Sequence, residues 1–175
     1  ARNSVIDSTA IGIEADTVQV RNLIVRSYYI AQNSEAPDRA GLPALRVKTL
    51  GDTGFDDEQV MPGVEDLQVQ FGIDTGDYDN DGAVDPAADV NGDGIPESDG
   101  RATRYVNPDF PGLDRAQVVS VRIWVRVRAD RPEPGFEDNR RYQYADVDYT
   151  PAGNEARFRR ALMSRTISLR NARTL

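Results

Sequence analysis

The chain of 175 residues contains no cysteine and no histidine, and its single lysine is Lys48. Without cysteine it has neither disulfide bonds nor thiolate chemistry. Without histidine it lacks the commonest general base and the commonest zinc ligand, which excludes Ser-His-Asp and Cys-His catalytic sites. Any metal ion must be held by oxygen atoms, which favours calcium, magnesium or manganese. We therefore expect a protein that is not an enzyme.

Long apolar segments are also missing from the sequence. No run of about 18 apolar residues occurs, so no transmembrane helix is predicted. The opening residues Ala1-Arg2-Asn3-Ser4 lack the apolar stretch of a signal peptide, and we interpret the chain as a processed or truncated piece. A hydrophobic share of 39% is adequate for a core. The length suits one domain, residues 1–175, with a long insertion at residues 74–106.

The excess of acidic residues is concentrated in one segment. The chain has 29 acidic and 21 basic residues, and residues 74–100 contain nine acidic residues and no basic ones. Outside this segment, 20 acidic residues are balanced by 21 basic ones. A concentrated block of like charge repels itself unless a cation neutralises it or the segment stays unfolded. This charge distribution therefore favours a bound cation.

The acidic segment contains a tandem repeat with a period of 12 residues. Oxygen-bearing side chains recur at the first, third, fifth and ninth places of each copy, and glycine holds the sixth. Calcium selects this pattern, and the seventh place supplies a backbone carbonyl. The candidate ligands are Asp77, Asp79, Asp81, Ala83 and Asp85 in the first copy, and Asp89, Asn91, Asp93, Ile95 and Glu97 in the second.

The repeat departs from an EF-hand at its twelfth place, where Ala88 and Gly100 replace the bidentate glutamate. Asp89 lies one residue late and is the candidate for a ligand shared by the two copies, and Asp99 lies one residue early and is a further candidate. The tandem is similar to the aspartate-rich calcium repeats of thrombospondin type 3 and dockerin modules, in which one repeat helps to close its neighbour's site. We predict one or two structural Ca²⁺ ions. The alternative is a solvated acidic turn without metal.

Alternation of apolar and polar residues predicts most of the secondary structure. The clearest strand covers residues 117–128, with valine and isoleucine on one face and Ser120, Arg122, Trp124, Arg126 and Arg128 on the other. Further strands are predicted within residues 17–31, 44–50, 64–73, 141–149 and 158–171. Loops are expected at residues 33–41, 51–57 and 130–139, and a short helix within residues 1–16.

The predicted fold class is mainly β, or α+β at most, with antiparallel sheets and a long loop ordered by metal. A 33-residue connection without structure would be unusual in a compact domain. Bound cations would supply the order that apolar burial cannot supply in residues 74–106.

Other candidate functional residues have simpler structural interpretations. Trp124 lies between Arg122 and Arg126 on one strand face, where guanidinium–indole contacts could form a ligand platform or simply cover the sheet. The tyrosines Tyr28, Tyr29, Tyr142 and Tyr144 are expected in the core or in cross-strand pairs. Arg159 and Arg160 do not form a basic cluster with stacking aromatics, and the net charge is −8, so nucleic acid is not an expected partner.

Five segments, in this order, resemble the PilW-type minor pilins of bacterial type IV pili. They are RSYYIA (26–31), LPALR (42–46), PGVEDLQVQFG (62–72), VVSVRIWV (118–125) and SRTISLRN (164–171). The resemblance covers most of the chain from about Val18 to Arg173, and its most specific parts are the third and fifth segments. It carries over no catalytic residue.

The resemblance implies that the chain is the head of a minor pilin whose N-terminal leader and apolar helix are not part of this sequence. Such subunits prime polymerisation in the inner membrane and stay at the tip of the pilus. The implied partners are other minor pilins and a tip adhesin, and the implied location is the cell surface or periplasm. Adhesion and twitching motility depend on the pilus as a whole.

Two alternatives remain open at this point. One is a pseudopilin at the tip of a type II secretion system, which shares the same architecture. The other is a secreted calcium-dependent adhesin or carbohydrate-binding domain, in which Trp124 or the acidic loop contacts the ligand.

Overall fold

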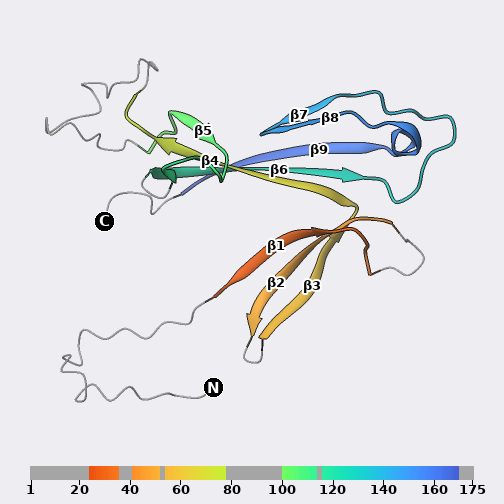
Figure 1. Cartoon of the computed structure of the whole chain (residues 1–175), viewed down its shortest axis with the longest axis horizontal. Helices are drawn as coiled ribbons and strands as arrows, with labels where there is room; N and C mark the ends of the chain where they lie inside the picture. Colours follow the sequence, from red (N-terminus) through yellow and green to blue (C-terminus); the bar gives the residue numbers. More distant parts are fainter. Residues whose placement is uncertain (1–23, 36–40, 52–53, 78–99, 114–115, 170–175) are drawn as a thin grey trace, which may run out of the picture.

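The computed structural model describes residues 24–35, 41–51, 54–77, 100–113 and 116–169 (Figure 1). In these ranges the chain forms three antiparallel sheets and one short 3₁₀ helix, η3 (Gly153–Arg157), which confirms the mainly β prediction. The strands are β1 (Arg26–Ala31), β2 (Ala44–Gly51), β3 (Gly54–Pro62), β4 (Val64–Asp74), β5 (Arg104–Val106), β6 (Gln117–Arg128), β7 (Tyr142–Tyr144), β8 (Val147–Tyr149) and β9 (Arg160–Ser168). Within these ranges, no helix is long and apolar enough to cross a membrane.

The first sheet has the order β1-β2-β3, and it contains a strand that the sequence did not reveal. We expected a loop at residues 51–57, but Phe55, Asp56 and Asp57 belong to β3. Acidic residues are poor strand formers, so their local preference argued for a loop. Pairing with β2 overrides that preference, since Lys48 lies directly opposite Asp57 in the register.

The second sheet has the order β5-β4-β6-β9, and it forms the body of the protein. The predicted strands at residues 64–73 and 117–128 become β4 and β6, which are paired from Val64–Val127 to Asp74–Gln117. The predicted C-terminal strand becomes β9, paired with β6 along its whole length. Because β6 contacts both β4 and β9, its central position explains why its sequence pattern is the cleanest in the chain.

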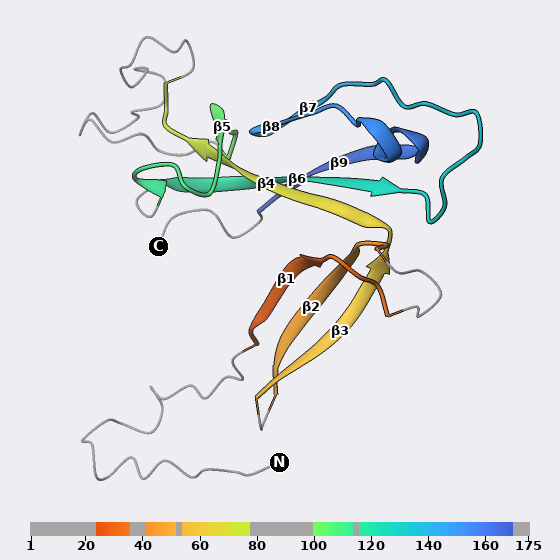
Figure 2. The same ribbon diagram turned by 45° about the vertical axis from the view of Figure 1, so that its right-hand side comes forward.

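Gly63 joins the two sheets where the chain passes from β3 to β4 (Figure 2). It adopts φ +84°, and an added Cβ atom would lie 2.9 Å from the carbonyl oxygen of Arg128. The Gly63 amide donates to the carbonyl of Pro43 (2.7 Å), and the Gly63 carbonyl accepts from the amide of Arg128 (2.8 Å). One glycine therefore holds β2, β4 and β6 together, and a side chain at this position would be strained.

The segment at residues 141–149, predicted as one strand, is instead a hairpin of two short strands. β7 and β8 pair from Tyr142–Tyr149 to Tyr144–Val147. Ala145, between them, adopts φ +49°, a conformation that reverses the chain. The alternation of Tyr142 and Tyr144 predicted strand structure correctly, but a turn without glycine or asparagine leaves no clear signal in the sequence.

Both faces of β6 are partly covered. The hairpin lies on the side that carries the arginines, where the rings of Tyr144 and Trp124 are 6.4 Å apart. As a result Arg126 is only 8% exposed, although it lies on the polar face of the predicted strand. Tyr142 and Tyr144 are buried as expected, whereas Tyr28 is 51% exposed and lies opposite Val47 in the β1–β2 pairing, which is the other position predicted for these tyrosines.

A buried ion network joins β4, β6 and β9. The Oε1 atom of Glu65 accepts hydrogen bonds from Nε of Arg126 (2.7 Å) and from Nε of Arg160 (2.6 Å). The side chains of these three residues are 10%, 9% and 0% exposed. Charged groups removed from water are costly unless they are paired and hydrogen-bonded, so this contact constrains the position of all three strands.

The network extends to the hairpin and to η3. Nη1 of Arg126 donates to the hydroxyl of Tyr144 (2.9 Å), and that hydroxyl donates to Asp66. Nη2 of Arg160 contacts Oε2 of Glu155 in η3 at 2.9 Å. The hairpin and η3 are thus held to the sheet by charged and hydroxyl groups, with the Arg126 guanidinium 4.0 Å from the centre of the Tyr149 ring.

Replacing Glu65 with alanine is expected to lower the free energy of unfolding by about 3–5 kcal/mol, because it leaves two buried guanidinium groups without their shared carboxylate. Urea denaturation measures this loss. The matched control is Glu133→Ala, which removes a solvent-exposed partner of Arg159 and should cost much less, because water screens an exposed ion pair. Equal losses in the two variants would contradict a central role for Glu65.

Alkaline pH is expected to destabilise the protein through its buried tyrosines. Burial, and then the hydrogen bond to Asp138, raises the pKa of Tyr142 to about 12. Since the unfolded chain releases this proton near pH 10, the free energy of unfolding should fall as the pH rises from about 10 to about 12. Denaturation at several pH values measures the slope.

The Tyr142→Phe variant should show a shallower fall over this pH range than the parent protein, because one of the shifted protons is gone. Tyr28→Phe, which removes the same hydroxyl from a half-exposed ring, is the matched control. An unchanged slope in Tyr142→Phe would show that another group causes the alkaline loss.

Candidate functional site

The two ends of the acidic insertion are held together at one edge of the four-stranded sheet. The carbonyl oxygen of Ile73 accepts hydrogen bonds from the amide (2.9 Å) and the hydroxyl (3.0 Å) of Thr103. The amide of Thr75 donates to the Thr103 hydroxyl (3.2 Å), and the two threonine hydroxyls are 2.9 Å apart. Asp74 is buried and accepts from the amide of Gly76 (3.0 Å). Residues 73–77 and 100–106 therefore form a fixed stem.

The stem is longer than the sequence suggested. We expected an unpaired connection at residues 74–106, but its last three residues form β5 and pair with β4. Gly72 makes this close approach possible, because an added Cβ atom would lie 2.1 Å from the Ser120 hydroxyl and 2.8 Å from Ala102. The short strand is hard to predict, since three residues carry too little periodic signal.

Of the predicted calcium ligands, only Asp77 lies among the described residues, where it is half-buried at the end of the stem. The other candidates lie outside the described residues: Asp79, Asp81, Ala83, Asp85, Asp89, Asn91, Asp93, Ile95, Glu97 and Asp99. Within the described ranges, no group of three or more carboxylates is arranged to hold a metal ion. The metal prediction therefore depends on the repeat and on the geometry of its stem.

Trp124 is half-buried and does not form the open platform considered above. The Tyr144 ring lies 6.4 Å from it, and the Arg122 guanidinium is 5.7 Å from its centre. Arg126, expected on the other side of the indole, instead stacks at 4.0 Å on the ring of Tyr149. Trp124 thus helps to attach the hairpin to the sheet, which favours the structural interpretation of this residue.

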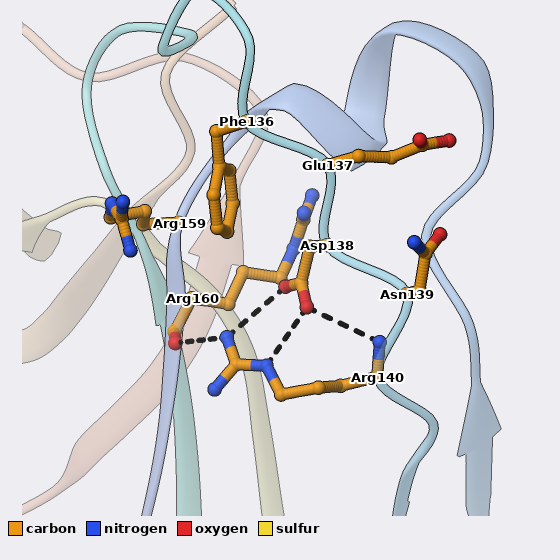
Figure 3. Close-up of a pocket in the computed structure, with 7 residues that line it drawn as sticks. All are labelled: Phe136, Glu137, Asp138, Asn139, Arg140, Arg159 and Arg160. Atoms are coloured by element: carbon orange, nitrogen blue, oxygen red, sulfur yellow. Dashed lines mark hydrogen bonds and ion pairs between the residues drawn. The ribbon is translucent and has the colours of Figure 1, made fainter.

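A cavity of about 450 Å³ lies beside the start of β9 (Figure 3). It is lined by Phe136, Glu137, Asp138, Asn139, Arg140, Arg159 and Arg160. Asp138 is 2% exposed and accepts hydrogen bonds from Nε of Arg140 (2.8 Å) and from the hydroxyl of Tyr142 (2.7 Å). Burial alone would raise the pKa of Asp138, but these hydrogen bonds outweigh it and hold the pKa below its ordinary value.

The arginines of this cavity all have partners. Arg140 also donates to the carbonyl of Arg160 (2.7 Å), Arg159 is paired with Glu133, and Arg160 is paired with Glu65. Each of these guanidinium groups is already paired with a carboxylate, and the lowered pKa keeps the Asp138 carboxylate ionised. The cavity is therefore a structural joint between the hairpin and β9.

A shallower hollow of about 370 Å³ lies beyond β5, near the stem. It is lined by Gln70, Tyr105, Val106, Asn107, Asp109, Phe110 and Pro111. Nε2 of Gln70 donates to Oδ1 of Asn107 (2.8 Å), and the Arg122 guanidinium covers the Tyr105 ring at 3.5 Å. A hydrogen bond with Ser120 and the charge of Arg122 lower the pKa of Tyr105. These contacts support β5 against the sheet.

An exposed cluster on the first sheet is likewise internally paired. Arg46 contacts Glu35 (2.8 Å) and Asp57 (2.8 Å), and Asp57 also accepts a hydrogen bond from Tyr29. The bonds from Tyr29 and then Arg46 lower the pKa of Asp57, while the same carboxylate raises the pKa of Tyr29. The cluster stabilises β1, β2 and β3 side by side.

Three structurally central residues escaped the sequence reasoning: Glu65, Asp138 and Arg160. Glu65 lies inside the segment PGVEDLQVQFG, which the resemblance singled out, but nothing local shows that its carboxylate is buried. The one feature of the sequence that could have indicated a buried carboxylate is an acidic residue in a strand predicted beside an arginine-bearing strand, since buried charges need partners.

The comparisons agree with the sequence resemblance. The family model described as PilW, Type IV Pilus-assembly protein W, matches residues 27–171, which include all of β2 to β9 and all but the first residue of β1. No curated protein and no solved structure matches the chain. PilW is a pilus-assembly family and not a known enzyme family, and it points to the cell surface or periplasm. The predicted resemblance is confirmed, and the chain belongs to the PilW family of type IV pilus-assembly proteins.

Proposed function

We propose that this chain is the head of a minor pilin that takes part in priming a type IV pilus and in assembling its tip. The match to the PilW family over residues 27–171 carries this proposal. Together the segments PGVEDLQVQFG and SRTISLRN contain the Gly63 junction, Glu65 of the ion network and most of β9. The segments that resemble the family are thus those that build the framework of the sheet.

The framework suits a subunit that presents surfaces rather than one that performs chemistry. The three arginines that line the larger cavity are each paired with a carboxylate, and the sequence includes no histidine or thiol to act as base or nucleophile. The partners we propose are other minor pilins and a tip adhesin, with attachment to the inner membrane before assembly. Adhesion and twitching motility would follow from the assembled pilus.

We further propose that the acidic repeat binds one or two Ca²⁺ ions in a structural role. The stem supports this proposal, because the hydrogen bonds between Thr103, Ile73 and Thr75 fix both ends of the segment on one sheet edge. Its candidate ligands are oxygen donors, as calcium requires, and residues 74–100 contain no basic side chain to neutralise them. Bound calcium would hold the insertion against the head.

Deletion of the gene in its own bacterium is expected to reduce the number of surface pili and to impair twitching, because priming fails without a minor pilin. Electron microscopy, sheared-pilus yield and a subsurface twitching assay measure these effects, with the full-length gene restored as the control. Normal pili combined with a defect in protein secretion would instead assign the chain to a type II secretion system.

Calcium is expected to raise the melting temperature of the head. At a free concentration 100 times the dissociation constant, a single bound ion adds about 2.7 kcal/mol to the free energy of unfolding. Thermal scans and calorimetric titration measure the effect. Asp81→Ala and Asp93→Ala should weaken binding, whereas Asp52→Ala, outside the repeat, should not. The absence of both heat and thermal shift would remove calcium from the proposal.

A further inference from the structure

We propose that the open edge of β9, from Leu162 to Ser168, binds an extended strand of a partner protein that places a carboxylate opposite Arg165. This inference rests on the proposed function, because a subunit that assembles must have a surface for its neighbour. It adds the location of that surface and the chemistry of the partner.

The hydrogen-bonding groups of this edge can be identified from the register. The amide of Leu169 donates to the carbonyl of Val119 (2.9 Å), and the amide of Ala129 donates to the carbonyl of Arg159 (2.8 Å). In an antiparallel pair, alternate residues bond to the partner strand, so odd-numbered residues of β9 face β6. The backbone groups of the even-numbered residues face outward, and these residues are Leu162, Ser164, Thr166 and Ser168.

The outward edge is closed at one end and open along the rest. Nη2 of Arg140 donates to the outward carbonyl of Arg160 (2.7 Å), which occupies the first position. In the order β5-β4-β6-β9 no strand follows β9 among the described residues. Every residue from Ala161 to Ser168 is exposed, in agreement with an unpaired edge.

Two other edge strands in the described ranges, β3 and β5, carry features that hinder strand pairing, and β9 lacks them. β3 carries Asp56, Asp57 and Glu58, has a register shift in its pairing and ends at Pro62. β5 has only three residues. Charge, bulges, proline and short length are the devices that prevent unwanted strand pairing. Along its nine residues β9 has no proline and pairs with β6 without a register shift.

The side chains of β9 also favour a partner. Met163 is 53% exposed and Ile167 is 47% exposed, and both lie on the same face of the strand as Arg165. Arg165 is opposite Ile123 of β6, and no carboxylate or aromatic ring within the described ranges contacts its guanidinium. A charge between two apolar side chains gains a partner when an opposite charge lies directly across from it on the next strand.

A second copy of this chain fits the edge poorly. If two β9 strands paired antiparallel around their centres, the two Arg165 side chains would lie opposite each other or on a diagonal. Like charges at such positions are destabilising. The edge therefore fits a different chain, with alternating apolar residues facing the side of Met163 and Ile167 and an aspartate or glutamate facing Arg165.

A synthetic peptide tests the proposal directly. The probe is a nine-residue peptide of alternating valine and threonine with glutamate at the central valine position, and amide hydrogen exchange is read by NMR. On binding, the amides of Leu162, Ser164, Thr166 and Ser168 should exchange about tenfold more slowly, because they gain hydrogen-bond acceptors on the peptide. The amides of Met163, Arg165 and Ile167, already bonded to β6, should not change.

Charge exchange tests the role of Arg165. Arg165→Glu should weaken binding of the glutamate peptide by about tenfold and restore binding to a peptide with lysine at that position. Arg131→Glu, an exposed residue on the loop after β6 with the same change of charge, should leave binding within about twofold. A peptide N-methylated at the residues that face β9 should not bind.

Four outcomes would overturn the proposal: even-numbered amides that are already protected in the free head, no gain of protection with peptide, equal binding of the N-methylated peptide, or Arg131→Glu acting like Arg165→Glu. Concentration-dependent dimerisation through β9 without peptide would assign the edge to a second copy instead. None of these results affects piliation after gene deletion, so failure of this inference is distinguishable from failure of the proposed function.

Discussion

The carboxylate of Glu65 is the contact on which the rest of the structure depends. It joins Arg126 of β6 and Arg160 of β9 at a place where water is largely excluded. In such a place an unpaired charge is far more costly than a missing apolar contact, so these strands have little freedom to slide. The hairpin of β7 and β8 meets the same need to pair a buried charge, because Tyr144 and Tyr149 cover the guanidinium of Arg126 on the face of the sheet.

This arrangement divides the protein into a fixed body and two accessible regions. The body consists of the four-stranded sheet, the hairpin on its arginine-bearing side and the first sheet attached through Gly63. At one edge the stem of the acidic insertion leaves the sheet between β4 and β5. At the opposite edge β9 is open. A subunit of a pilus-assembly family needs a rigid frame that presents such regions, because each docking event otherwise costs conformational entropy.

Sequence reasoning predicted the long strands well and the short ones poorly. β4, β6 and β9 show alternation over nine or more residues, and their positions were found within a few residues. β3 was missed because its acidic residues favour a loop locally, and only pairing with Lys48 and its neighbours makes it a strand. The split of residues 141–149 was missed because Ala145 gives no turn signal. Of the candidate metal ligands, only Asp77 falls among the described residues.

The amino-acid sequence alone determined the mainly β class, the family and the position of the acidic repeat, because alternation, motif order and charge density are properties of neighbouring residues. Only the tertiary structure decided which charges are buried and which edge is free. Glu65, Arg126 and Arg160 are far apart in the sequence, and their pairing depends on the order of strands in the sheet. The open edge of β9 has the same origin, since a strand becomes an edge only through the placement of all the others.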